Sequence, residues 1–158
     1  MDSKTRKILI AMDGSDHSLQ TYNYYLKNIR HPEDEVLIAW NVDPHPASYG
    51  TVNLMTGDPD IINKVLNEHV IHIKHTVKNL ENLLANDQLQ GRVLQLHNAR
   101  AGEGIIKAAT DENVDMIIVG SRGLGTIRRT ILGSVSDYVL HHAHIPVFIC
   151  KFEHSSHK

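Results

Sequence analysis

The chain has 158 residues, of which 41% are hydrophobic and 22% charged, and its formal net charge is −2. These values predict one globular domain that folds without a metal or a disulfide, and they exclude the concentrated basic face of a nucleic-acid-binding protein. Cys150 is the single cysteine and the first apolar run is too short for a secretion signal or a membrane span, so we expect a cytoplasmic protein with no membrane partner.

Apolar runs alternate with helical periodicities along the chain. The runs predict buried strands at Lys7–Met12, Val36–Trp40, Val93–Leu96, Met116–Val119 and Val147–Lys151. Apolar residues at helical spacing predict helices at Leu19–Ile29, Ile62–Asn86, Gly102–Asn113 and Ser134–His142, with a long loop over 44–59. This alternation favours a doubly wound, Rossmann-like α/β domain with a parallel sheet over residues 1–152, followed by a polar tail at 153–158.

Glycines flank the fourth predicted strand and the last predicted helix. Gly120–Gly123 follows the strand, and Gly133 and Ser134 begin the helix after nine intervening residues. Glycine permits positive φ and close approach of a ligand to the main chain, and the first amides of a helix attract anions. Ser134 is the expected N-cap, with Asp137 completing a pattern like a capping box. The segment therefore predicts a phosphate-binding site.

The spacing Gly-x2-Gly-x9-Gly-Ser resembles that of the nucleotide-binding universal stress proteins. The opening Asp13-Gly14-Ser15 and the closing His144-Ile145-Pro146-Val147 are also similar to that family. The resemblance implies five strands in the order 3-2-1-4-5, ATP as ligand with Mg²⁺ carried by its phosphates, and a role in the stress response. It also implies a homodimer formed through the fifth strand, at Val147, Phe148, Ile149 and Cys150.

In the implied strand order the first and fourth strands are neighbours, so their carboxyl ends form the switch point where such sheets bind ligands. The predicted nucleotide site is made up of Met12, Asp13, Val42, Val119, Gly120, Arg122, Gly123, Gly133, Ser134, Val135 and Ser136. By resemblance, Asp13 contacts the nucleoside and the backbone of Val42 meets the adenine. The alternative is that Asp13 only caps the first helix, unless Ser15 or Ser18 takes that place.

Three functions remain open at this point. The first is a nucleotide-dependent regulator, which the intact glycine pattern favours. The second is a slow ATP hydrolase or phosphoryl-transfer enzyme, in which Asp13 would hold Mg²⁺ and Arg122, Arg128 and Arg129 would stabilise charge. No dedicated base and no catalytic residue is assigned, although His17 lies close to Asp13 in sequence. The third is a dimeric scaffold without a nucleotide. The clustered histidines lack the spacing of a zinc site, and no metal-ligating residue is assigned.

Overall fold

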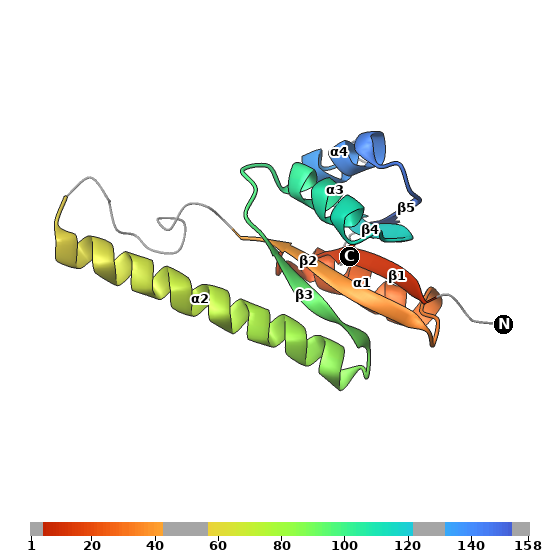
Figure 1. Ribbon diagram of the computed structural model, residues 1–158, viewed down its shortest axis with the longest axis horizontal. Coiled ribbons are helices and arrows are strands. Elements are labelled where there is room, and N and C mark those ends of the chain that lie inside the picture. Colours follow the sequence, from red (N-terminus) through yellow and green to blue (C-terminus); the bar gives the residue numbers. More distant parts are fainter. Residues whose placement is uncertain (1–4, 43–56, 122–131, 153–158) are drawn as a thin grey trace, which may run out of the picture.

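The computed structural model describes residues 5–42, 57–121 and 132–152. In this part of the chain the strands are β1 (Arg6–Ala11), β2 (Asp34–Asn41), β3 (Gln90–Leu96), β4 (Met116–Ser121) and β5 (Val147–Lys151). The helices are α1 (Asp16–Asn28), α2 (Pro59–Asn86), α3 (Ala101–Asp111) and α4 (Ser134–His142). All strand pairs are parallel and the order is β3-β2-β1-β4-β5, which confirms the predicted doubly wound α/β fold (Figure 1).

Helices cover both faces of the sheet, and the strand side chains alternate between two separate cores. On one face, Tyr22 and Tyr25 of α1 and Leu80 of α2 pack against strand residues such as Ile10. On the other face, α3 and α4 pack on the alternate strand residues, such as Leu9. Burial on both faces explains why the strands are continuous apolar runs in the sequence rather than alternating ones.

The observed elements are longer than the predicted ones where their ends are polar. β2 begins at Asp34 and β3 at Gln90, before the apolar runs that mark them in the sequence. Helix α2 ends at Asn86 as predicted but begins at Pro59, in residues that we expected to lie in a loop. Asp58 explains this start, because its side chain accepts a hydrogen bond from the amide of Asp60 at 2.9 Å and Pro59 occupies the first turn.

A buried ionic cluster joins the amino ends of β1 and β2. The Asp34 carboxylate accepts hydrogen bonds from the Arg6 guanidinium, the Tyr25 hydroxyl and the His31 amide at 2.8–2.9 Å. Arg6 also donates to the carbonyl of Ile29 at 3.0 Å, so the end of α1 is tied to the same cluster. The cluster lies at the opposite end of the strands from the predicted nucleotide site, and its role is therefore structural.

None of the helices in 5–42, 57–121 and 132–152 combines the length and apolar character that crossing a bilayer requires.

Candidate functional site

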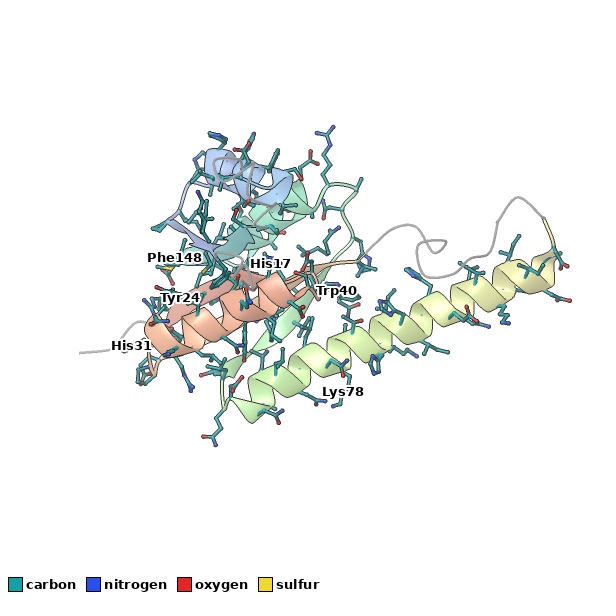
Figure 2. All side chains as sticks on the ribbon, turned by 180° about the vertical axis from the view of Figure 1, so that it is seen from behind. His17, Tyr24, His31, Trp40, Lys78 and Phe148 are labelled. Atoms are coloured by element: carbon teal, nitrogen blue, oxygen red, sulfur yellow. The ribbon has the colours of Figure 1, made fainter. Side chains whose placement is uncertain are left out.

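The candidate site lies where the winding of the sheet reverses, between β1 and β4. These strands are paired directly, with Ile10 opposite Ile118, so their carboxyl ends at Ala11 and Ser121 are at the same edge. Helix α1 begins at this edge and runs back along the sheet, as the positions of His17 and His31 near its two ends show (Figure 2). Since α4 connects β4 to β5, which is parallel to it, α4 also begins at this edge. The fold thus brings Asp13 and the Gly133–Ser136 segment to one edge of the sheet.

The start of α4 has the features expected of an anion site. Gly133 is its N-cap and no side chain caps the helix, whereas α1 is capped by Ser15 and α2 by Asp58. Ser134 and Val135 are exposed at the first two positions of the helix. The amides of the first turn, together with the positive end of the helix dipole, are therefore directed to the carboxyl edge without a competing cap.

The prediction that Ser134 caps α4 is wrong, because Ser134 is the first helical residue and Gly133 precedes it with extended φ and ψ of −63° and 153°. The Ser136 hydroxyl is buried and donates to the carbonyl of Gly133 at 3.0 Å. The Asp137 side chain does not complete a capping box but lies 3.5 Å from His141, one turn along the helix. Of the two predicted phosphate ligands with hydroxyl groups, Ser136 therefore uses its hydroxyl in a hydrogen bond within the turn, whereas the hydroxyl of Ser134 is exposed.

Asp13 follows β1 and is exposed at the carboxyl edge. Its carboxylate accepts hydrogen bonds from both the amide and the hydroxyl of Ser15, and the amide bond is 3.0 Å long. Ser15 in turn caps α1 by accepting a hydrogen bond from the Ser18 amide at 3.2 Å. Ser15 is thus the cap of α1 and Asp13 orients that cap, while the contact of Asp13 with a nucleoside stays a prediction. Gly14 permits the turn with a φ of +81°.

The apolar residues of the predicted site line the ends of the strands. Met12 and Val42 are buried just beyond β1 and β2, Val119 is buried within β4, and Val135 is exposed on α4. The amide of Val42 donates to the carbonyl of Leu96 at 2.7 Å, so the amide is not available for the predicted contact with adenine. Met12 is held in the same way, since its amide donates to the carbonyl of Ala39 at 2.9 Å.

Gly120 packs closely against α1. It lies inside β4 and does not adopt positive φ, so the chain does not turn off the strand at this residue, and its contact with a nucleotide stays a prediction. A Cβ on Gly120 would lie 2.5 Å from the Thr21 hydroxyl oxygen of α1, a distance that real contacts do not reach. Gly120 is therefore required for the close packing of α1 on β4, which sets where α1 and Asp13 lie. The sequence carries no signal for this contact, because Thr21 is distant along the chain.

Two residues of the predicted site, Arg122 and Gly123, lie outside the described residues, as do Arg128 and Arg129. Their predicted contacts with phosphates remain predictions. In the described part of this edge, the acidic residues are Asp13, Asp16 and Asp137, and no group of three or more metal-ligating side chains occurs in 5–42, 57–121 or 132–152.

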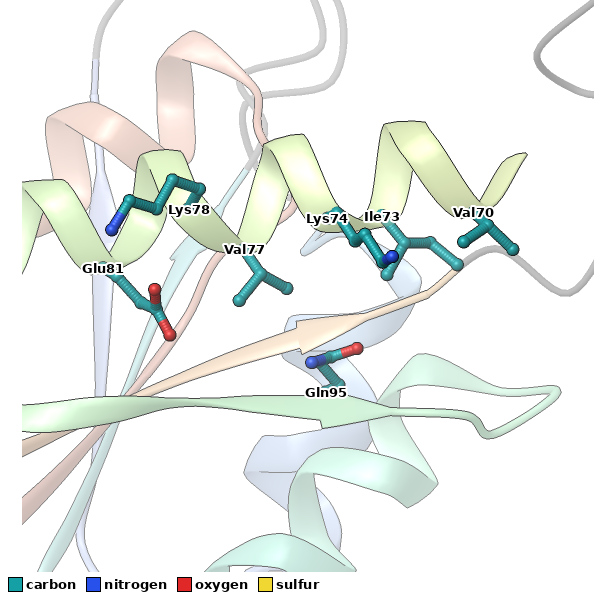
Figure 3. Close-up of a pocket in the computed structure, with 7 residues that line it drawn as sticks. All are labelled: Val70, Ile73, Lys74, Val77, Lys78, Glu81 and Gln95. Carbon is teal, nitrogen blue, oxygen red and sulfur yellow. The ribbon is translucent and has the colours of Figure 1, made fainter. Parts of the chain in front are cut away.

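A surface groove is found at a different place. It lies between α2 and β3, has a volume of about 390 Å³, and is lined by Val70, Ile73, Lys74, Val77, Lys78, Glu81 and Gln95 (Figure 3). β2 separates β3 from the β1–β4 switch point, so this groove does not belong to the predicted nucleotide site. No pattern in the sequence predicts this groove, because it forms only when α2 packs over the edge of the sheet.

Comparison with known proteins resolves the family. The sequence profile of the Universal stress protein family matches residues 4–151, which is nearly the whole chain. The chain belongs to the universal stress protein family. One relative, the universal stress protein MJ0531 of Methanocaldococcus jannaschii, is 28% identical over 147 residues, which cover 92% of this chain and 82% of the relative.

Solved structures of other universal stress proteins share the fold. The structure of MJ0577 from the same archaeon aligns with a TM-score of 0.70 at 24% identity, over 96% of this chain and 99% of that one. A universal stress protein of Arabidopsis thaliana, solved with AMP bound, aligns with a TM-score of 0.67 at 17% identity, over 94% and 93% of the two chains. The strand order and the placement of the four helices are thus the same in this universal stress protein and in its structural neighbours.

Proposed function

We propose that this universal stress protein binds ATP or a related adenine nucleotide at the β1–β4 switch point and acts in the cytoplasm as a nucleotide-dependent regulator of the stress response. The observation that carries the proposal is the uncapped start of α4, at Gly133, which faces the same edge of the sheet as Asp13. The Arabidopsis neighbour with bound AMP supports an adenine nucleotide as the ligand.

Different groups of the chain bind different parts of the nucleotide. The amides of Ser134 and Val135 bind phosphate oxygens, and Asp13 accepts hydrogen bonds from the ribose hydroxyls. One such helix terminus contributes about 0.3–1 kcal/mol per charge, whereas micromolar affinity needs about 8 kcal/mol. Burial of the apolar surface of the base itself, at the end of β1 and β2 where Met12 and Val42 lie, supplies much of the remainder. Mg²⁺, when present, is carried by the phosphates.

Val42 makes the proposal specific for adenine. Its amide is already bonded to Leu96, so its carbonyl is the group that meets the base. The carbonyl accepts a hydrogen bond from the exocyclic amino group of adenine, whereas the oxygen at the same position of guanine would repel it. Acid extraction of the purified protein should release an adenine nucleotide, and titration calorimetry should give tighter binding of ATP than of GTP. Equal affinity for both nucleotides would refute the placement of the base at Val42.

The site also predicts slow chemistry. Backbone amides bind the phosphates equally well before and after hydrolysis, and equal binding of ground state and transition state does not accelerate a reaction. The Asp13 carboxylate is engaged with Ser15, which makes it a poor general base. We expect ATP turnover far below the median enzyme rate of about 10 per second.

In a single-turnover assay with labelled ATP and Mg²⁺, Asp13→Asn should weaken binding more than it lowers the rate at saturation. Fast turnover that Asp13→Asn abolishes while ATP still binds would show an enzyme instead.

The outer edge of β5, which pairs with β4 alone among the described strands, predicts a homodimer. Pro146 accepts a hydrogen bond from Ile117 of β4, and because successive residues alternate in direction, Ile149 directs its amide away from β4. The ring of Phe148 stacks on that of Tyr24 with 5.8 Å between the ring centres (Figure 2). Phe152 meets Tyr24 edge-on at 6.5 Å, and the three rings form an apolar surface beside the edge. An apolar edge of this kind favours strand pairing between two copies.

Ile149→Pro should convert the dimer to a monomer in light scattering without unfolding the domain, because it removes an amide that the β4–β5 pairing does not use. Phe148→Pro is the matched control, since it removes the neighbouring amide that faces β4 and should also destabilise the fold. Wild-type protein that stays monomeric at high concentration would contradict the proposed dimer.

A further inference from the structure

The outer edge of β3 carries unpaired backbone groups. Leu96 directs its carbonyl to β2, where it accepts a hydrogen bond from Val42 at 2.7 Å. Because successive residues of a strand alternate in direction, Val93 and Gln95 direct their amides and carbonyls away from β2. Among the described strands β3 pairs with β2 alone, so these groups form a template for one more strand.

Helix α2 overhangs this edge and closes one side of a groove along it. Val77 of α2 and Gln95 of β3 point toward one another across the groove (Figure 3). Its lining is mostly apolar, from Val70, Ile73 and Val77, and its volume of about 390 Å³ is enough for one or two side chains. A free strand edge beside an apolar groove under a helix is the arrangement in which extended peptides bind by adding a strand.

The charges at the rim select the chemistry of the peptide. Lys74 and Lys78 are exposed residues one helical turn apart, and their side chains point in opposite directions along α2, with Lys78 directed toward Glu81 (Figure 3). A carboxylate on the peptide is therefore attracted beside Lys74 and repelled near Glu81. Residues at i and i+2 of a strand lie about 7 Å apart on one face. An apolar residue in the groove therefore places an acidic residue two positions away beside Lys74.

We propose that this universal stress protein binds an extended segment of a partner protein along β3. The segment pairs with the outward backbone groups of Val93 and Gln95, inserts an apolar side chain between Ile73 and Val77, and pairs a carboxylate with Lys74. This site is separate from the nucleotide site, and the proposal stands whether or not ATP binds at the switch point.

A displayed library of random peptides of about seven residues, panned against the full chain, tests the proposal. Enriched peptides should carry an acidic residue two positions from an apolar one.

In fluorescence polarisation with such a peptide, Val70→Asp should raise Kd at least about tenfold, or 1.4 kcal/mol. Ile71→Asp is the matched control, because Ile71 is 65% exposed on the same helix, against 47% for Val70, and does not line the groove. Lys74→Glu should weaken binding similarly, whereas Lys64→Glu should not.

Strand addition has its own readouts. The amides of Val93 and Gln95 should become protected from hydrogen exchange when the peptide binds, and Gln95→Pro should abolish binding while the circular dichroism spectrum is unchanged. AMP at saturating concentration should not displace the peptide. The proposal is overturned if no peptide is enriched, if Val70→Asp and Ile71→Asp have equal effects, or if peptides bind without protecting Val93 and Gln95.

Discussion

Asp34→Ala should lower the free energy of unfolding by about 3–5 kcal/mol, because it removes one partner from a buried ionic cluster. The Asp34 side chain is fully buried and bonded to Arg6, Tyr25 and the amide of His31. Without the carboxylate, the Tyr25 hydroxyl and the His31 amide lose their acceptor, while Arg6 is partly exposed and regains some hydration. Urea denaturation at neutral pH measures the loss.

The neighbouring residue provides the control. Glu35→Ala removes a surface ion pair with Arg92, which is 49% exposed, and should cost less than about 1 kcal/mol. Equal losses for Asp34→Ala and Glu35→Ala would show that the buried cluster contributes no more than a surface pair.

The same cluster predicts how stability depends on pH. Burial by itself raises the pKa of Asp34, but hydrogen bonds from Arg6, His31 and Tyr25 outweigh it and hold the pKa below the ordinary value of 3.8. The unfolded chain then takes up a proton at Asp34 before the folded chain does, so this contribution to stability is present above pH 3.8 and is lost as pH falls through the folded pKa. The stability difference between wild type and Asp34→Ala should therefore narrow below pH 3.8. A difference that stays constant down to pH 2 would contradict a lowered pKa.

Ser134→Glu should weaken ATP binding at least about tenfold, or 1.4 kcal/mol, while leaving the domain as stable as the wild type or more so. Ser134 is exposed at the first position of α4, where no side chain caps the helix. A carboxylate there interacts favourably with the helix dipole, by about 0.3–1 kcal/mol, and repels the phosphates from the same amides. The opposite signs of the two effects separate a binding role from a structural one. Calorimetric titration with ATP and thermal denaturation measure them.

The start of α3 provides a matched control for this substitution. Its N-cap, Arg100, also makes no side-chain capping bond, so Ala101→Glu should give a similar gain from the dipole. That variant should keep its ATP affinity, because α3 follows β3 rather than β4. If Ser134→Glu binds ATP as tightly as the wild type, the phosphates do not lie at α4.

The amino-acid sequence by itself determined the class of the fold and the place of the candidate site. Apolar runs such as Ile8–Met12 and Met116–Val119 predict strands because residues buried on both faces of a sheet must all be apolar. The glycine pattern from Gly120 to Ser134 marked the start of α4, and resemblance to a family supplied the strand order that the structure has. The sequence does not predict the polar first residues of β2 and β3, because the signal for a buried strand is a run of apolar residues.

Tertiary structure decided what individual residues do. Gly120 is a predicted site residue, and the structure adds that it makes room for Thr21 of α1, which packs directly on β4. Ser134 was predicted to cap α4, yet Gly133 holds that position and the Ser136 hydroxyl bonds to it. The groove under α2 had no sequence signal, because its residues meet only when the helix packs over the edge of β3. Periodicity reports which residues are buried, whereas contacts between distant segments depend on packing geometry that no local pattern encodes.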